Sequence, residues 1–269
     1  MNEKDKNDEN RKGKIKENII IGNIKVEKNN LKQKIINYYE NEYGSLYKNE
    51  EIKNEKEIKE CEIFINDKKI NFSYYYNFPK EGEYIIKYMF KNLLKSTSYM
   101  FSGCNSLISL DLSNFNTQNV TYMEYMFEVC NSIISLNLSN FNTQNVINME
   151  YMFAYCNSLI SLNLSNFNTQ NVIDMGDMFR GCNSLISLDL SNFNTQNVID
   201  MGFMFSDCNS LISLNISDFN TQNVIDMKYM FIGCNSLISL NLSNFNIRNV
   251  TDIENMFYDC NSLIYKHFN

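Results

Sequence analysis

The feature that most constrains this chain is a cysteine that returns at a constant interval, first at Cys104 and then through to Cys260 near the C-terminus. The residues around each cysteine repeat almost unchanged, so the stretch Met100–Tyr125 recurs along the chain. The interval is 26 residues. Self-similarity at a period of this length is typical of a solenoid, whose units bury their apolar faces against their neighbours. The seven cysteines of this column are Cys104, Cys130, Cys156, Cys182, Cys208, Cys234 and Cys260.

Within one repeat, the apolar spacing changes from strand-like to helix-like. Leu110 and Leu112 alternate with polar residues, which predicts a strand with these leucines inside and Asp111 outside. Phe115 follows in a turn as a further buried side chain. The apolar residues between positions 120 and 130 then recur at helical spacing, which predicts a short helix packed on the strand.

We therefore expect residues 96–269 to form an α/β solenoid. It would be a stack of seven 26-residue coils with short parallel strands and short helices. Because helices are bulkier than strands, the sheet is expected to line the concave face of the stack.

The part of the chain before the repeats is interpreted in two pieces. Residues 1–18 are charged and lack periodicity, which predicts a disordered tail. Residues 19–95 are expected to form a small α+β or mostly β module that caps the open end of the stack. Its predicted elements are strands at 19–26 and 83–90, a hairpin over 62–77, an amphipathic helix over 31–42 and a solvated loop or surface helix at 48–60.

The motif LISLDLSNFNTQNV, followed by M-x-x-M-F-x-x-C-N-S, resembles the BspA-like leucine-rich repeats, a family also called DUF285. The resemblance covers the repeats from Cys104 to Cys260. It implies a leucine-rich-repeat solenoid. It also implies adhesion or protein–protein recognition, because bacterial members are commonly cell-surface proteins.

Charge and hydropathy bear on partners and location. The formal net charge is −7, and Asp and Glu outnumber Lys and Arg by 14 to 4 over residues 96–269. An acidic surface repels phosphate, so we expect no nucleic-acid partner. No apolar run reaches the length of a membrane helix, so no membrane insertion is expected. The charged start lacks the apolar segment of a signal peptide, which favours a cytoplasmic protein, with the cell surface as the alternative.

Catalytic and metal chemistry find no support in the residue types. The sequence has one histidine, His267, and neither a C-x-x-C pair nor a glycine-rich phosphate loop. We expect no enzyme activity, no metal and no cofactor. The cysteine column is interpreted as buried core thiols, because parallel side chains do not point toward one another. A second structural column is expected to point inward and bond neighbouring turns: Asn116, Asn142, Asn168, Asn194, Asn220 and Asn246.

Two surfaces are candidates for binding. The outward strand face is polar and suits a polar ligand or an extended peptide, unless it is merely solvated. Its candidate residues are Ser109, Asp111, Asn137, Asn163, Asp189, Asn215 and Asn241.

The helical face differs between copies and carries an aromatic column, which either binds a partner or covers the short helix. Its candidates are Tyr125, Tyr151, Phe203 and Tyr229. The sequence thus predicts a non-enzymatic scaffold that recognises a protein or peptide partner. The alternative is a cell-surface adhesin or structural repeat protein of the BspA type.

Overall fold

The structure is a computed structural model that describes residues 18–38 and 53–268. This part of the chain is rich in strands and contains one short helix. The predicted disordered tail lies outside the described residues, apart from Asn18. The elements are β1 Asn18–Val26, β2 Lys32–Lys34, α1 Glu55–Lys59, β3 Glu62–Ile65, β4 Lys68–Ile70, β5 Tyr75–Asn77, β6 Gly82–Phe90, β7 Leu107–Asn114, β8 Ser135–Asn137, β9 Ser187–Asp189, β10 Ser213–Asn215, β11 Ser239–Leu242 and β12 Tyr265–Phe268.

The N-terminal module is an antiparallel sheet in the order β4-β3-β6-β1, which continues into the repeats through β7 and β8. Strands β1 and β6 pair along their whole length, from Asn18 opposite Phe90 to Val26 opposite Gly82. Alternate residues of β1 are buried, as its apolar alternation predicts. The predicted strands at 19–26 and 83–90 are therefore confirmed.

Two predictions in this module need correction. The helix expected over 31–42 is wrong, because β2 pairs antiparallel with β5 and the Ile35 N–H donates to Tyr74 O at 2.9 Å. Pairing with a partner strand thus outweighs the helical spacing of the apolar residues in this segment. Residues 39–42 of the predicted helix lie outside the described residues. The hairpin is real but shorter than expected, since its second strand ends at Ile70. Asn66 and Asp67 form its turn, both with positive φ.

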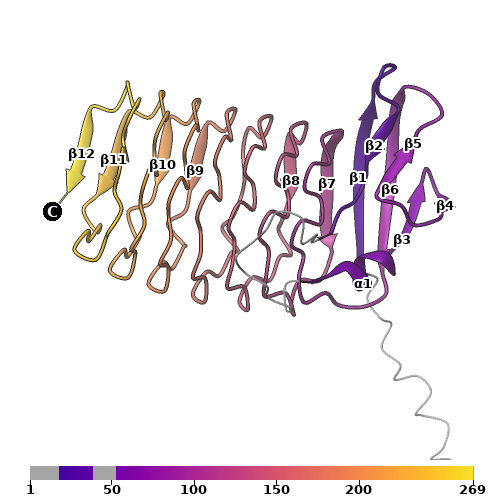
Figure 1. Cartoon of the computed structure of the whole chain (residues 1–269), viewed down its shortest axis with the longest axis horizontal. Helices are drawn as coiled ribbons and strands as arrows, with labels where there is room; N and C mark the ends of the chain where they lie inside the picture. The colour runs from indigo at the N-terminus through magenta and orange to yellow at the C-terminus, as the bar shows by residue number, and fades with distance from the viewer. Residues whose placement is uncertain (1–17, 39–52, 269) are drawn as a thin grey trace, which may run out of the picture.

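The repeats lie side by side as a row of coils that begins against the module (Figure 1). Successive coils are joined by parallel bridges between equivalent residues, from Ser96–Tyr122 through to Asp226–Asp252. Strand β1 pairs antiparallel with β7 and so covers the edge of the first coil. The module and the repeats share one continuous apolar core.

The short helices expected on each coil are wrong, because this segment is a series of tight turns. The N–H groups of Met123, Tyr125 and Phe127 donate to carbonyls of the next coil at 2.9–3.1 Å. Tyr125 and Val129 have positive φ, which a right-handed helix does not allow. A helix of about two turns is too short to be stable by itself, whereas the ladder between coils satisfies the same groups. The prediction that the sheet lines the concave face assumed bulky helices on the other side. Without those helices, the prediction has no support.

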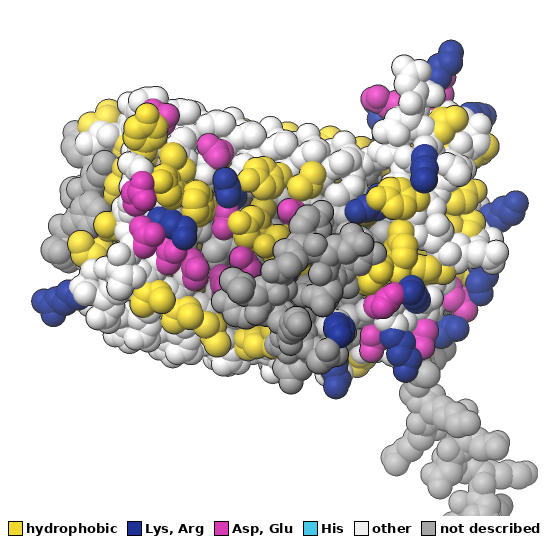
Figure 2. Space-filling model, in the orientation of Figure 1, with side chains coloured by type: hydrophobic (Ala, Val, Ile, Leu, Met, Phe, Trp, Pro, Cys, Tyr) yellow, Lys and Arg dark blue, Asp and Glu magenta, His cyan; other side chains and the backbone are white. Residues whose placement is uncertain are grey.

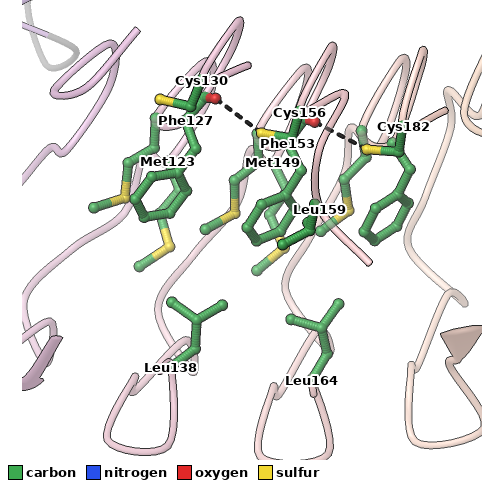
Figure 3. Packing of buried hydrophobic residues seen from close by; sticks show 14 of the residues in the cluster. Met123, Phe127, Cys130, Leu138, Met149, Phe153, Cys156, Leu159, Leu164 and Cys182 are labelled. Atoms are coloured by element: carbon green, nitrogen blue, oxygen red, sulfur yellow. Dashed lines mark hydrogen bonds between the residues drawn. The ribbon is translucent and has the colours of Figure 1, made fainter. Parts of the chain in front are cut away.

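Most of the apolar residues expected inside the coils are buried. The predicted column from Val120 to Cys130 is fully buried, and Phe127 stacks on Phe153 with ring centroids 5.6 Å apart. Figure 3 shows how the phenylalanines, methionines and cysteines of neighbouring coils align. The strand leucines split: Leu164 is buried, whereas Leu162, also expected inside, is only half-buried.

Candidate functional site

The aromatic column predicted on the variable side of the coils exists. We call this side the turn face, meaning residues 122–129 and the equivalent residues of the other coils. Tyr125 stacks on Tyr99 at 4.5 Å and on Tyr151 at 4.6 Å, with the rings nearly parallel. Phe203 stacks on Tyr229 at 4.9 Å. These rings are half-buried, so each covers its neighbour and still reaches solvent.

A charged pair interrupts the aromatic column between Tyr151 and Phe203. Asp177 stands at the aromatic register and accepts a bond from Arg180, Nη1 to Oδ1 3.0 Å. The Arg180 guanidinium lies 4.7 Å from the Phe203 ring centroid and 5.7 Å from that of Tyr155. The turn face therefore already binds one guanidinium between a carboxylate and aromatic rings.

Beside the rings runs an acidic ladder that the sequence analysis missed. It consists of Asp174, Asp200, Asp226 and Asp252, which are bridged coil to coil. In each, Oδ1 accepts the N–H of the residue two positions on, at 2.8–3.1 Å. The signal was in the sequence, because these aspartates recur once per repeat where the first coils have Tyr122 and Asn148.

Two carboxyl groups of this ladder, those of Asp174 and Asp200, have a raised pKa and are hard to ionise. Burial raises the pKa of Asp174 to about 7, although the hydrogen bond from the Gly176 N–H acts to lower it. The negative charge of Asp200 adds to the rise. Burial also raises the pKa of Glu150 to about 8, with further contributions from Asp174 and Asp177. Like charges a few ångströms apart near a surface repel by several kcal/mol, roughly 4 at 4 Å. The turn face therefore holds carboxyl groups whose ionisation is unfavourable.

The polar candidates of the strand face behave differently. Asp111, Asn137, Asn163, Asp189, Asn215 and Asn241 are exposed, and each accepts the N–H of the serine two residues on at 3.0–3.4 Å. The hydrogen bond from the Ser191 N–H contributes most to holding the pKa of the Asp189 carboxyl below its usual value. Ser109 lies apart from the others, because its hydroxyl accepts a bond from Asn23 of β1 at 2.9 Å. The side-chain acceptors of the strand face thus find their hydrogen-bond partners within their own turns.

Exposed isoleucines border the strand face and were not singled out by the sequence analysis. They recur once per coil, and each side chain is about half exposed. Their recurrence directly before a serine in each repeat could have revealed them. They are Ile134, Ile160, Ile186, Ile212 and Ile238.

Six of the seven structural cysteines are buried as expected, whereas Cys260 is only partly buried and the asparagine column is not where it was expected. Cys104 through Cys234 are buried thiols, and the Cys156 Sγ donates to Phe127 O of the preceding coil at 3.1 Å (Figure 3). The expected inward asparagines are wrong in orientation: Asn142 is exposed and its Oδ1 accepts the Gln144 N–H within its own turn.

Other side chains of the repeat connect the coils instead. The buried Thr117 hydroxyl donates to Asn142 O at 3.0 Å and accepts the Asn142 N–H at 2.8 Å. An amide ladder follows the cysteines, as in Asn157 Nδ2 to Asn131 Oδ1 at 3.0 Å. The inter-coil role predicted for one asparagine column thus belongs to a threonine column and to the asparagines after the cysteines.

A polar hollow of about 730 Å³ lies between α1 and the first coils. Lys53, Glu57, Lys95 and Asn119 are among its lining residues. Within the described residues, no group of three or more His, Cys, Asp or Glu could hold a metal ion. Across residues 18–38 and 53–268, no helix has the length and apolar character needed to cross a membrane.

The comparisons place the repeats in a family. The model described as "Mycoplasma protein of unknown function, DUF285" matches residues 80–186 and 183–267. The chain belongs to this family. The match confirms the resemblance on which the repeat motif was interpreted, and it covers the last strand of the module as well as the coils. No curated protein and no solved structure matches the chain.

Proposed function

We propose that this DUF285 protein is a non-enzymatic scaffold of the leucine-rich-repeat type that recognises a protein partner through its turn face. The observation that carries the proposal is the half-buried aromatic column formed by Tyr99, Tyr125 and Tyr151 and, further along, by Phe203 and Tyr229. Large rings held rigidly and open to solvent are the side chains that dominate protein interfaces.

The contrast between the two faces supports this choice. The strand face repeats small polar residues whose hydrogen bonds are met within their own turns. The turn face changes from coil to coil, with tyrosine, aspartate and phenylalanine at one register. A surface whose features differ along its length can distinguish one partner from another, whereas a uniform one offers no preferred register.

The test is proximity labelling in the source cell, with the labelling enzyme fused to the C-terminus. The turn-face variant changes Tyr125, Tyr151, Phe203 and Tyr229 to Asn, because Asn255 occupies the same register with positive φ. The matched control changes Asn137, Asn163, Asn215 and Asn241 to Ser.

We expect a small set of intracellular proteins that the turn-face variant loses and the control retains. Loss in the control alone would overturn the choice of face. Labelling of envelope or extracellular proteins would instead support the surface adhesin.

A further inference from the structure

The ladder of hydrogen bonds along the turn face runs in one direction. In every coil that is followed by another, four alternate N–H groups donate to carbonyls of the next coil, as in Met227 to Asp252 at 2.8 Å. Each coil therefore presents donors toward the C-terminal end of the stack and acceptors toward the N-terminal end. The two ends of the stack (Figure 1) thus carry opposite edges of this ladder.

The N-terminal edge is closed by the module, which stands in place of a preceding coil. Asn54 is buried and donates from Nδ2 to Ser98 O at 2.8 Å, and the Asn37 N–H donates to Met100 O at 2.7 Å. Longer bonds from the side-chain amides of the same two asparagines reach the carbonyls on either side. Because β1 also pairs with β7, this end of the stack is occupied on both faces of the coil.

The C-terminal edge is open within the described residues. The last coil places Ile253, Asn255 and Asp259 at positions whose N–H groups donate forward in every preceding coil. In the part of the chain that the structure describes, none of these three N–H groups has an acceptor. A row of unpaired backbone donors is a template for another chain, because each donor gains a hydrogen bond where an acceptor meets it.

Apolar side chains accompany the open donors. Ile253 is 44 % exposed, whereas Met227, at the same position of the preceding coil, is fully buried. Ile247 is 48 % exposed and stands where the preceding coil has the bridging Thr221. Figure 2 shows apolar side chains among acidic ones toward this end of the molecule. A terminal repeat that faces water has a polar outer surface, so an apolar one indicates an interaction site.

The polarity of the edge decides which partner fits it. Two C-terminal edges of this chain would place donors against donors, and the N-terminal edge of a second copy is occupied by its own module. An extended strand fits less well, because N–H and C=O groups alternate along its edge. The best complement is a row of carbonyls at the spacing of the ladder, which a coil of the same repeat presents on its N-terminal side.

We propose that the C-terminal edge binds the first coil of another DUF285-type repeat protein, one whose carbonyl edge is open. The bound coil would accept the N–H groups of Ile253, Asn255 and Asp259 and bury the Ile253 side chain, as each coil of this stack does for the one before it. The inference goes beyond the proposed function, because it concerns the end of the stack and not the aromatic column along its side.

The experiment uses the full chain with the photo-crosslinking residue benzoylphenylalanine in place of Ile253. The matched control carries the same residue in place of Ile173, which is equally exposed at 43 % but lies in a central coil. Both chains are irradiated in the source cell, and the crosslinked peptides are mapped by mass spectrometry. We expect position 253, and not position 173, to crosslink to the first coil of a second repeat protein.

The crosslinked protein is then purified and titrated against the full chain. Ile253→Asp should weaken binding about tenfold or more, because the complex buries the new carboxylate, while Ile173→Asp stays within about twofold. Amide hydrogen exchange at Ile253 and Asn255 should slow in the complex, and that of Met227, which is already bonded, should not change. Thermal melts confirm that both variants are folded.

A crosslink from position 253 to a protein without such coils, or no crosslink at all, would contradict the inference. Equal loss of binding in the two variants would place the contact along the side of the stack instead. Self-association of the purified chain in sedimentation, abolished by Ile253→Asp, would make a second copy the partner and the argument from polarity wrong. Each of these results can occur while the turn-face variant still loses its cellular partners, in which case the proposed function stands.

Discussion

Two aspartates on opposite sides of the coils show how differently one repeat treats its two faces. On the strand face, Asp189 is exposed, and the Ser191 N–H keeps the pKa of its carboxyl low. On the turn face, Asp174 also accepts a backbone N–H, yet burial raises its pKa to about 7. The same side chain and the same local bond thus give opposite shifts, because burial and neighbouring acids outweigh one hydrogen bond.

The largest effects should come from the core that both faces share. Phe179, under the turn face, stacks on Phe153 and Phe205 at 5.7 Å, and Leu164 lies buried under the strand face. We expect Phe179→Ala to cost roughly 3–5 kcal/mol of unfolding free energy and Leu164→Ala roughly 2–5 kcal/mol. Denaturant unfolding provides the measurement.

Asn163→Ala is the control for these core changes, because this side chain is exposed. It should cost less than about 1 kcal/mol. A loss at Asn163 as large as that at Leu164 would show that the strand face is not the outside of the coil.

A smaller effect should distinguish the faces by their backbone. Within the described residues, the turn face repeats positive φ in every coil, and the strand face has none. An alanine at Gly181, with φ +68°, would bring its Cβ within 2.5 Å of the Tyr155 ring. Gly181→Ala should therefore cost roughly 2–3 kcal/mol, from left-handed strain and the clash together.

Gly103→Ala separates these two causes. Gly103 has nearly the same φ, +71°, but the nearest atom to an added Cβ is the flexible Lys34 Nζ at 3.4 Å. Strain alone should cost about 1–2 kcal/mol. If thermal melts show equal losses at the two glycines, the ring of Tyr155 moves aside and the turn face is softer than described.

The smallest effect concerns pH. A carboxyl whose pKa is higher in the folded state than in the unfolded chain binds more protons when folded, so stability falls as pH rises. For Asp174 that loss begins near its ordinary pKa of 3.8 and is complete above about 7. Asp174→Asn should thus stabilise the protein at pH 8 by about 1 kcal/mol after allowance for solvent screening, or roughly 2–4 °C in Tm.

Asp189→Asn is the matched change on the strand face. Because the pKa of Asp189 is lowered, its ionised form favours folding above its ordinary pKa, and this contribution disappears only in acid. We expect no gain in Tm at pH 8. A stabilisation equal to that of Asp174→Asn would mean that both effects reflect the net charge of the repeats and not the burial of one ladder.

The sequence by itself determined the repeat, its period and most of its buried apolar residues. Spacing alone placed Phe115, Met123 and Phe127 inside, because a short coil has one interior and every copy must fill it in the same way. The family followed from the same motif.

Only the tertiary structure decided which partners the backbone N–H and C=O groups of each coil bond to. A periodicity of three to four residues fits a helix and a run of tight turns equally well. The choice depends on the neighbouring coil, whose carbonyls accept the N–H groups of Met123, Tyr125 and Phe127. The same holds for β2, which became a strand because β5 lay beside it.

The acidic ladder likewise required the stacked structure. In the sequence, Asp174 and Asp200 are a full repeat apart and Gly176 is one small residue among many. Stacking brings the two carboxyls to either side of that glycine and buries them together, which is what raises the pKa of each. A one-dimensional pattern records which residues recur, whereas their mutual charge and exposure arise when the coils meet.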